Sequence, residues 1–165
     1  MEKLETPDTH YLNAAIGWME LGNPEEAIAE LEMIAQENRN HPHALEIRWR
    51  IHATAENWTE ALNVARKFLE VAPDSPIGWI NQSYSLHELK RTQEAFEALL
   101  QAATKFPTAS IIPYNLACYA CQLGQLEVAR KCLAVAVELK SKDEIKAMAL
   151  ADLDLKPLWD FVHAL

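Results

Sequence analysis

Glycine, cysteine and long apolar runs are all scarce in this chain, and each scarcity excludes a class of protein. Only 4 of the 165 residues are glycine, which argues against a β-rich or loop-rich fold. No apolar run approaches the roughly 18 residues that a membrane-spanning helix needs. The first ten residues, MEKLETPDTH, lack the basic and apolar regions of a secretory signal peptide. The 3 cysteines, an odd number, fit a reducing compartment better than a disulfide framework, so we expect a cytoplasmic protein.

Positive charge is also in short supply. The chain has 15 lysines and arginines against 24 aspartates and glutamates, a net charge of −9. Such a protein repels phosphate backbones and anionic lipids, so we expect neither nucleic acid nor a membrane as partner. Half of the residues are hydrophobic, and a chain of this length suits one compact domain or one short solenoid.

The sequence does contain a regular repeat. The stretch from Pro73 to Pro107 has a proline at each end, thirty-four residues apart. Alanines recur at the same interval, each within a segment of helical apolar spacing: Ala27, Ala61, Ala95 and Ala129. Two helices cross closely only over a small side chain, and a leucine there would overpack the crossing at a cost of roughly 1–3 kcal/mol. The period therefore predicts an all-α array of helix pairs.

The residues between the helices predict where each pair turns. Gly22 suits a left-handed helix end, Asn23 a cap, and Pro24 a first helical position. The turn at residues 90–92 lacks such a glycine, so we expect it to be strained or differently shaped. Pro113 should delay or kink the first helix of the fourth repeat.

The period fades after Ser141, and we expect residues 142–165 to form a C-terminal cap. Two short helices, about 143–151 and 157–165, should be joined by an acidic linker at 152–154. The apolar residues expected to cover the end of the fourth repeat are Leu150, Leu153, Leu155, Leu158, Trp159 and Phe161.

With these residues in place, the chain resembles the tetratricopeptide repeat family over about residues 8–140. The resemblance is carried by Trp79, Gly22, Gly124, the four alanines, Phe68, Pro73 and Pro107. Departures are Glu56 and Lys90 at the turn glycine, Pro113 at an aromatic position, and Arg39 and Ser141 at the closing proline. The tail also resembles the ending of small bacterial members.

The resemblance implies a fold and a domain division. The fold would be a right-handed α-solenoid of about four helix pairs plus C-terminal capping helices. Residues 1–165 would form a single domain, with repeats at about 8–40, 41–73, 74–107 and 108–141, followed by the cap.

In the family, the first helix of each repeat lines a concave groove. Asn13, Asn81 and Asn115 stand fourteen residues before three of the alanines, and Ile47 before the fourth. An amide offers both a donor and an acceptor to a peptide backbone, as in the similar asparagine ladder of O-linked N-acetylglucosamine transferase. Alternatively, these asparagines stay solvated or brace the next helix. The implied peptide-binding groove consists of Leu12, Asn13, Ile16, Ile47, Arg50, Ile77, Ile80, Asn81, Tyr84, His87, Tyr114, Asn115 and Cys118.

The lining of this groove is apolar for an open surface, which is typical of a partner site. Its occupant is a peptide or helix of another protein, or else the chain's own ends or a second subunit. Arg50 is the only lysine or arginine among the predicted groove positions, so a clamp for a terminal carboxylate is not expected.

The sequence indicates no catalytic chemistry. Cys118 and Cys121 form a CxxC in mid-helix, whereas redox pairs open a helix, and with Cys132 they still lack a fourth metal ligand. We read them as packing groups and expect no enzyme, cofactor or metal. The predicted function is a non-catalytic adaptor or scaffold. The alternatives are a secretion-type chaperone for apolar segments, an assembly subunit that self-associates as a homo-oligomer, and a thiol redox or metal protein.

Overall fold

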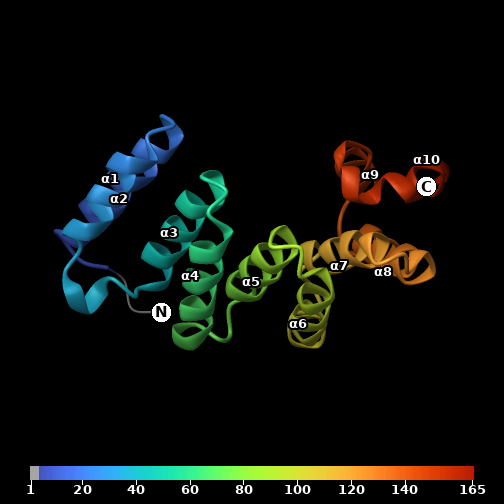
Figure 1. Ribbon diagram of the computed structural model, residues 1–165, viewed down its shortest axis with the longest axis horizontal. Coiled ribbons are helices and arrows are strands. Elements are labelled where there is room, and N and C mark those ends of the chain that lie inside the picture. The colour runs from blue at the N-terminus through green and yellow to red at the C-terminus, as the bar shows by residue number, and fades with distance from the viewer. Residues whose placement is uncertain (1–3) are drawn as a thin grey trace. The chain divides into compact units, whose positions relative to one another are not determined.

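The computed structural model describes residues 4–165, and the regular secondary structure of this range is all helical (Figure 1). The described residues form ten α-helices and two 3-10 helices, with no strand. The prediction of an all-α fold of helix pairs is confirmed. The contacts divide the chain into two compact units, Met1–Ser85 (unit 1) and Leu86–Leu165 (unit 2), which we describe in turn. The division into four repeats and a cap within one domain stays a prediction.

Unit 1 contains two complete helix pairs and most of a fifth helix. Its elements are α1 (Asp8–Glu20), α2 (Pro24–Met33), the 3-10 helix η1 (Gln36–Asn38), α3 (Pro42–Thr54), α4 (Trp58–Val71) and α5 (Pro76–Glu88), which runs on into unit 2. Helix α1 packs against α2, and α3 against α4 (Figure 1). Three of these helices begin at a proline, because the first helical N–H needs no partner within the helix.

Helix α2 is held at its C-terminal end by the first residue of α1. The helix stops at Met33, and Ile34 is extended. The Asp8 carboxylate accepts the N–H of Ala35 at 3.0 Å and the side-chain amide of Asn38 at 2.6 Å. These two hydrogen bonds, the backbone one first, hold the pKa of Asp8 below its ordinary value. A hydrogen bond to Asp8, the first residue of α1, thus satisfies the Ala35 N–H where α2 does not continue.

Unit 2 contains the end of α5 and six further elements. These are α6 (Thr92–Lys105), α7 (Ile111–Gln122), α8 (Leu126–Leu139), α9 (Lys142–Ala151), the 3-10 helix η2 (Leu153–Leu158) and α10 (Trp159–Ala164). Helix α7 packs against α6, α8 and η2. The expected late start of α7 is wrong. The helix begins at Ile111, and Pro113 lies in its first turn, where a missing N–H removes no helical bond.

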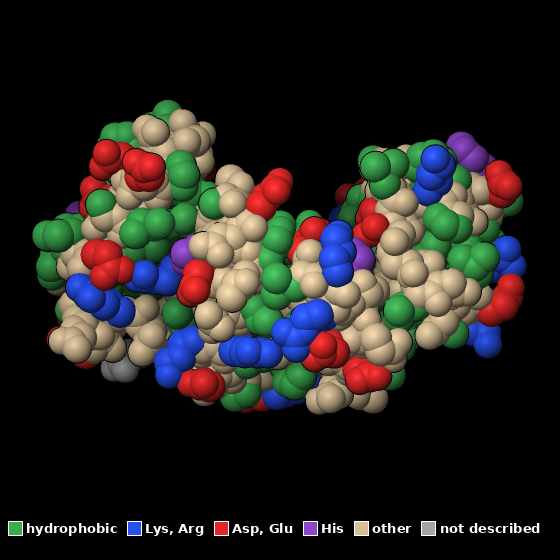
Figure 2. All heavy atoms as spheres, viewed as in Figure 1, with side chains coloured by type: hydrophobic (Ala, Val, Ile, Leu, Met, Phe, Trp, Pro, Cys, Tyr) green, Lys and Arg blue, Asp and Glu red, His purple; other side chains and the backbone are tan. Residues whose placement is uncertain are grey.

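The four periodic alanines lie inside the units. Ala27 and Ala61 in unit 1, and Ala95 and Ala129 in unit 2, are each 0% exposed. Within residues 4–165, no helix is both long enough and apolar enough to cross a bilayer. On the face drawn in Figure 2, acidic and basic side chains both occur over each unit.

The turn within each helix pair has the same backbone shape, whether or not it holds a glycine. Gly22 and Gly124 have φ of 74°, while Glu56 and Lys90 have φ of 54° and 63°. The expectation of a different shape at residues 90–92 is therefore wrong. Two residues with a Cβ adopt the left-handed conformation that glycine takes without a steric penalty.

Glycine at these two positions should stabilise the protein. We expect Glu56→Gly and Lys90→Gly each to raise the free energy of unfolding by about 0.5–1 kcal/mol. The left-handed penalty of about 1–2 kcal/mol is relieved, but glycine loses more backbone freedom on folding. Urea denaturation would measure the change. Glu97→Gly, within α6, is the matched control and should lower stability by about 1 kcal/mol. If all three variants lose stability equally, the turn geometry is wrong.

Candidate functional site

Two of the residues predicted to line a groove lie in the hydrophobic core of unit 1 instead. Leu12 of α1 and Ile47 of α3 are both buried, and they pack in the same cluster as Ala15, Leu31 and Ile51. Their side chains are on the faces by which α1, α2 and α3 contact one another. The prediction that they form a binding surface is therefore corrected: they hold the helices together.

The other predicted residues of unit 1 differ in accessibility. Asn13 and Arg50 are exposed, and Ile16, Ile77 and Ile80 are half-buried. Ile77 packs against a small cluster of Leu45, Val64 and Phe68. Asn81 is only 7% exposed, and its backbone carbonyl accepts a hydrogen bond from the hydroxyl of Ser85 at 2.8 Å.

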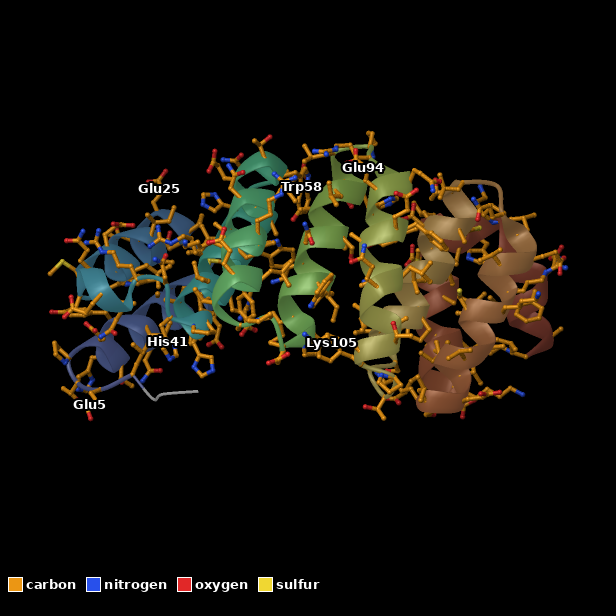
Figure 3. All side chains as sticks on the ribbon, turned by 90° about the horizontal axis from the view of Figure 1, so that it is seen from below. Glu5, Glu25, His41, Trp58, Glu94 and Lys105 are labelled. Atoms are coloured by element: carbon orange, nitrogen blue, oxygen red, sulfur yellow. The ribbon has the colours of Figure 1, made fainter. Side chains whose placement is uncertain are left out.

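Tyr84 is the predicted groove residue with the most distinctive surroundings. Its side chain is 39% exposed, and two tryptophans lie beside its ring. The ring centroids are 6.2 Å from Trp49 and 5.6 Å from Trp58, both in edge-to-face arrangements. Trp49 donates its indole N–H to the Ser85 hydroxyl at 3.0 Å, and Trp58, labelled in Figure 3, opens α4. Three helices therefore meet in one aromatic group with Tyr84 at its accessible side.

Sequence reasoning missed Trp58 in this group. It is the first residue of α4 and directly follows a polar turn. A tryptophan next to a polar turn was the signal that could have found the aromatic group.

In unit 2 three predicted groove residues bond to the chain's own C-terminal segment. Tyr114 donates its hydroxyl to Asp152 Oδ2 at 3.0 Å, and the Cys118 thiol donates to the same oxygen at 3.4 Å. His87 Nε2 lies 2.9 Å from Asp154 Oδ2. All three side chains are buried, whereas Asn115 is half-buried. They would reach a ligand only after the segment has moved.

The thiols of unit 2 are in surroundings that suppress their reactivity. Burial, followed by the nearby Asp152 carboxylate, raises the pKa of Cys118 far above its ordinary value. Burial likewise raises the pKa values of Cys121 and Cys132. The thiolate is the nucleophile and metal ligand, so these cysteines are poorly suited to either role at neutral pH. Over residues 4–165, no group of three or more histidine, cysteine or acidic side chains could hold a metal ion.

The comparisons with known proteins agree with this helix-pair architecture. A tetratricopeptide repeat family model matches residues 48–110, which include α4, α5, α6 and part of α3. The chain has the fold of tetratricopeptide repeat proteins. A search of curated proteins found no match.

Solved structures of this fold cover nearly the whole chain. MamA from Desulfovibrio magneticus RS-1 is 21% identical, with 99% of this chain and 97% of that chain covered and a TM-score of 0.74. A thermophilic tetratricopeptide repeat protein of Thermus thermophilus is 18% identical, with coverage of 96% and 100% and a TM-score of 0.71. PilF of Pseudomonas aeruginosa is 22% identical, with coverage of 92% and 67% and a TM-score of 0.75. At these identities the likeness establishes the fold alone.

The fold sets the general class of function. Tetratricopeptide repeats are generally non-catalytic scaffolds, whose stacked helix pairs present an extended surface to other proteins. What such a surface binds depends on the side chains that it presents.

Proposed function

We propose that this tetratricopeptide repeat protein is a non-catalytic adaptor or scaffold that binds a peptide or helical segment of another protein, and that Tyr84 in unit 1 is the main anchor of that site. The proposal rests on one observation: Tyr84 is 39% exposed, while Trp49 and Trp58 lie beside its ring. Tyrosine and tryptophan dominate binding energy when neighbouring side chains hold them in place.

The surroundings of Tyr84 support a binding role. Ile80 lies one helical turn before Tyr84 on the same side of α5 and is half-buried, so it adds apolar surface next to the ring. Arg50 on α3 is exposed, so unit 1 also presents a positive charge to a ligand. The contacts of Tyr84 with Trp49 and Trp58 restrict its ring before any ligand arrives. Less side-chain freedom is then lost on binding.

The asparagines of the predicted ladder differ in how accessible their amides are to a ligand. Asn13 offers an exposed amide and Asn115 a half-buried one, whereas little of Asn81 is accessible. Within unit 1, the exposed amide of Asn13 would hold one peptide unit of an extended ligand. The net contribution is about 0.5–1.5 kcal/mol for a hydrogen bond, whatever the ligand's side chains.

A test needs ligands, and random peptides displayed on phage would supply them by selection on the whole chain. Tyr84→Ala should then weaken binding by about 2 kcal/mol or more for most selected peptides, because a central aromatic anchor is lost. Asn13→Ala should cost about 0.5–1.5 kcal/mol for all of them alike. Isothermal titration calorimetry measures both losses.

The matched control is Leu100→Ala, which removes an apolar side chain that is 52% exposed on α6 and lies outside the site. It should leave every affinity unchanged. Selected peptides that are uniformly apolar and unaffected by Asn13→Ala would favour a chaperone for apolar segments. If Tyr84→Ala binds every peptide as well as the parent does, the site is not on this face of unit 1.

A further inference from the structure

The C-terminal segment of unit 2 begins with an aspartate whose two carboxylate oxygens are both engaged. Asp152 Oδ1 accepts the N–H of Asp154 at 3.0 Å, which turns the chain out of α9. Oδ2 accepts the Tyr114 hydroxyl at 3.0 Å and the Cys118 thiol at 3.4 Å. Tyr114 and Cys118 are four residues apart on α7, so they lie on one face of that helix. This carboxylate is therefore recognised by two side chains of one helix.

The second carboxylate of the segment is held two residues further on. Asp154 Oδ2 lies 2.9 Å from His87 Nε2, and its carbonyl accepts the Gln122 amide at 3.0 Å. The other ring nitrogen of His87 lies 3.1 Å from the Thr92 hydroxyl. The His87 ring also lies against Tyr119, with 4.9 Å between ring centroids. These contacts fix the imidazole in the position that meets Asp154.

The apolar side chains of the segment are divided between the interior and the solvent. Leu155 is 0% exposed, whereas Leu153, between the two aspartates, is 73% exposed. The segment therefore presents Asp152, Asp154 and Leu155 to unit 2 and turns Leu153 outwards. A peptide bound to a protein surface shows the same division between side chains that are recognised and side chains that are not.

The chemistry of the face under the segment is also specific. Its polar groups that meet the two aspartates are a phenol, a thiol, an imidazole and an amide. All can donate a hydrogen bond, and none comes from lysine or arginine. A segment that served only to exclude water could do so with apolar side chains. Polar groups buried beneath it would add a requirement, because each buried donor needs an acceptor. The phenol, the thiol and the imidazole meet the two carboxylates, and the amide of Gln122 donates to the backbone carbonyl of Asp154. This set of groups makes a binding face for acidic segments.

We propose that this face of α7, together with His87, is a second and masked binding site for short acidic segments of the pattern Asp-x-Asp-Leu. Residues 152–155 occupy it as an intramolecular ligand. A partner segment of the same chemistry binds by replacing them. This inference goes beyond the function proposed for unit 1, because it concerns other residues and holds even if the Tyr84 site fails.

The chain's own tail competes with any partner for this face. A tethered segment acts at an effective concentration in the millimolar range. A free peptide therefore binds weakly as long as the tail keeps its two carboxylates, and tightly once they are neutralised. The difference between the two states measures the competition.

The probe is a fluorescent synthetic peptide with the sequence of residues 150–159, titrated with the full-length chain. The variant Asp152→Asn/Asp154→Asn should bind it at least about tenfold more tightly than the parent, because charge-assisted hydrogen bonds of the tail have been lost. Adding His87→Ala or Tyr114→Phe to this variant should reverse the gain. A peptide with asparagine at both aspartate positions should bind neither protein tightly.

Two controls separate masking from general destabilisation. Asp160→Asn, which changes an exposed carboxylate of α10, should bind the peptide as the parent does. Alkylation of Cys118, located by mass spectrometry, should be faster in the double variant and slow again when the peptide is added. If the double variant is poorly folded, Asp154→Asn alone should show a smaller gain. The proposal is overturned if parent and variants bind the peptide equally, or if His87→Ala leaves the gain intact.

Discussion

Leu155→Ala lowers the free energy of unfolding by about 2–5 kcal/mol, while Leu153→Ala, two residues earlier, changes it by less than about 0.5 kcal/mol. This is the largest effect that we expect from a single substitution in the C-terminal segment. Leu155 is 0% exposed and Leu153 is 73% exposed, although the sequence assigned both to the cap. Truncating the first leaves a cavity in unit 2, and truncating the second leaves none.

Urea denaturation of the parent and the two variants measures this difference. The pair is matched in residue type, segment and size of truncation, so only burial distinguishes the two changes. Equal destabilisation by both variants would mean that η2 does not bury Leu155 and expose Leu153. Unchanged stability in both would make the segment a free tail, and the masked site would fail with it.

The second large effect concerns the periodic alanines. Ala61→Leu in unit 1 and Ala95→Leu in unit 2 should each lower the free energy of unfolding by about 1–3 kcal/mol. Both side chains are 0% exposed, and three added carbon atoms have no space at the helix crossing without moving a neighbouring helix.

The control for this series is Ala29→Leu, an exposed alanine two residues beyond Ala27 on α2. Its leucine projects into solvent, so the free energy of unfolding should change by less than about 0.5 kcal/mol. Denaturation midpoints that stay unchanged in Ala61→Leu and Ala95→Leu would contradict the repeat register itself.

The repeat and its turns were predictable because they depend on local requirements. A small residue at each crossing, a proline at a helix start and a glycine at a left-handed turn each have a physical cause within one helix pair. Even so, Glu56 and Lys90 adopt the left-handed shape without glycine. The packing of the helix pair therefore decides the turn conformation, and the residue type only sets its cost.

The division between core and binding surface was less predictable. Leu12 and Ile47 have the helical phase of a groove residue but are buried, because α1, α2 and α3 meet over them. Tyr84 was likewise predicted to line the groove, and it stays accessible beside tryptophans of α3 and α4. Phase along one helix cannot distinguish these cases, since both outcomes depend on a neighbouring helix.

The sequence by itself determined that this protein is an array of helix pairs, because a thirty-four-residue period of crossing alanines repeats one packing requirement along the chain. Only the tertiary structure decided what covers α7. Asp152 finds Tyr114 38 residues earlier in the chain, and Asp154 finds His87 67 residues earlier. No local propensity encodes contacts over such separations, because they form only after the intervening helices have packed and brought the donors to one face.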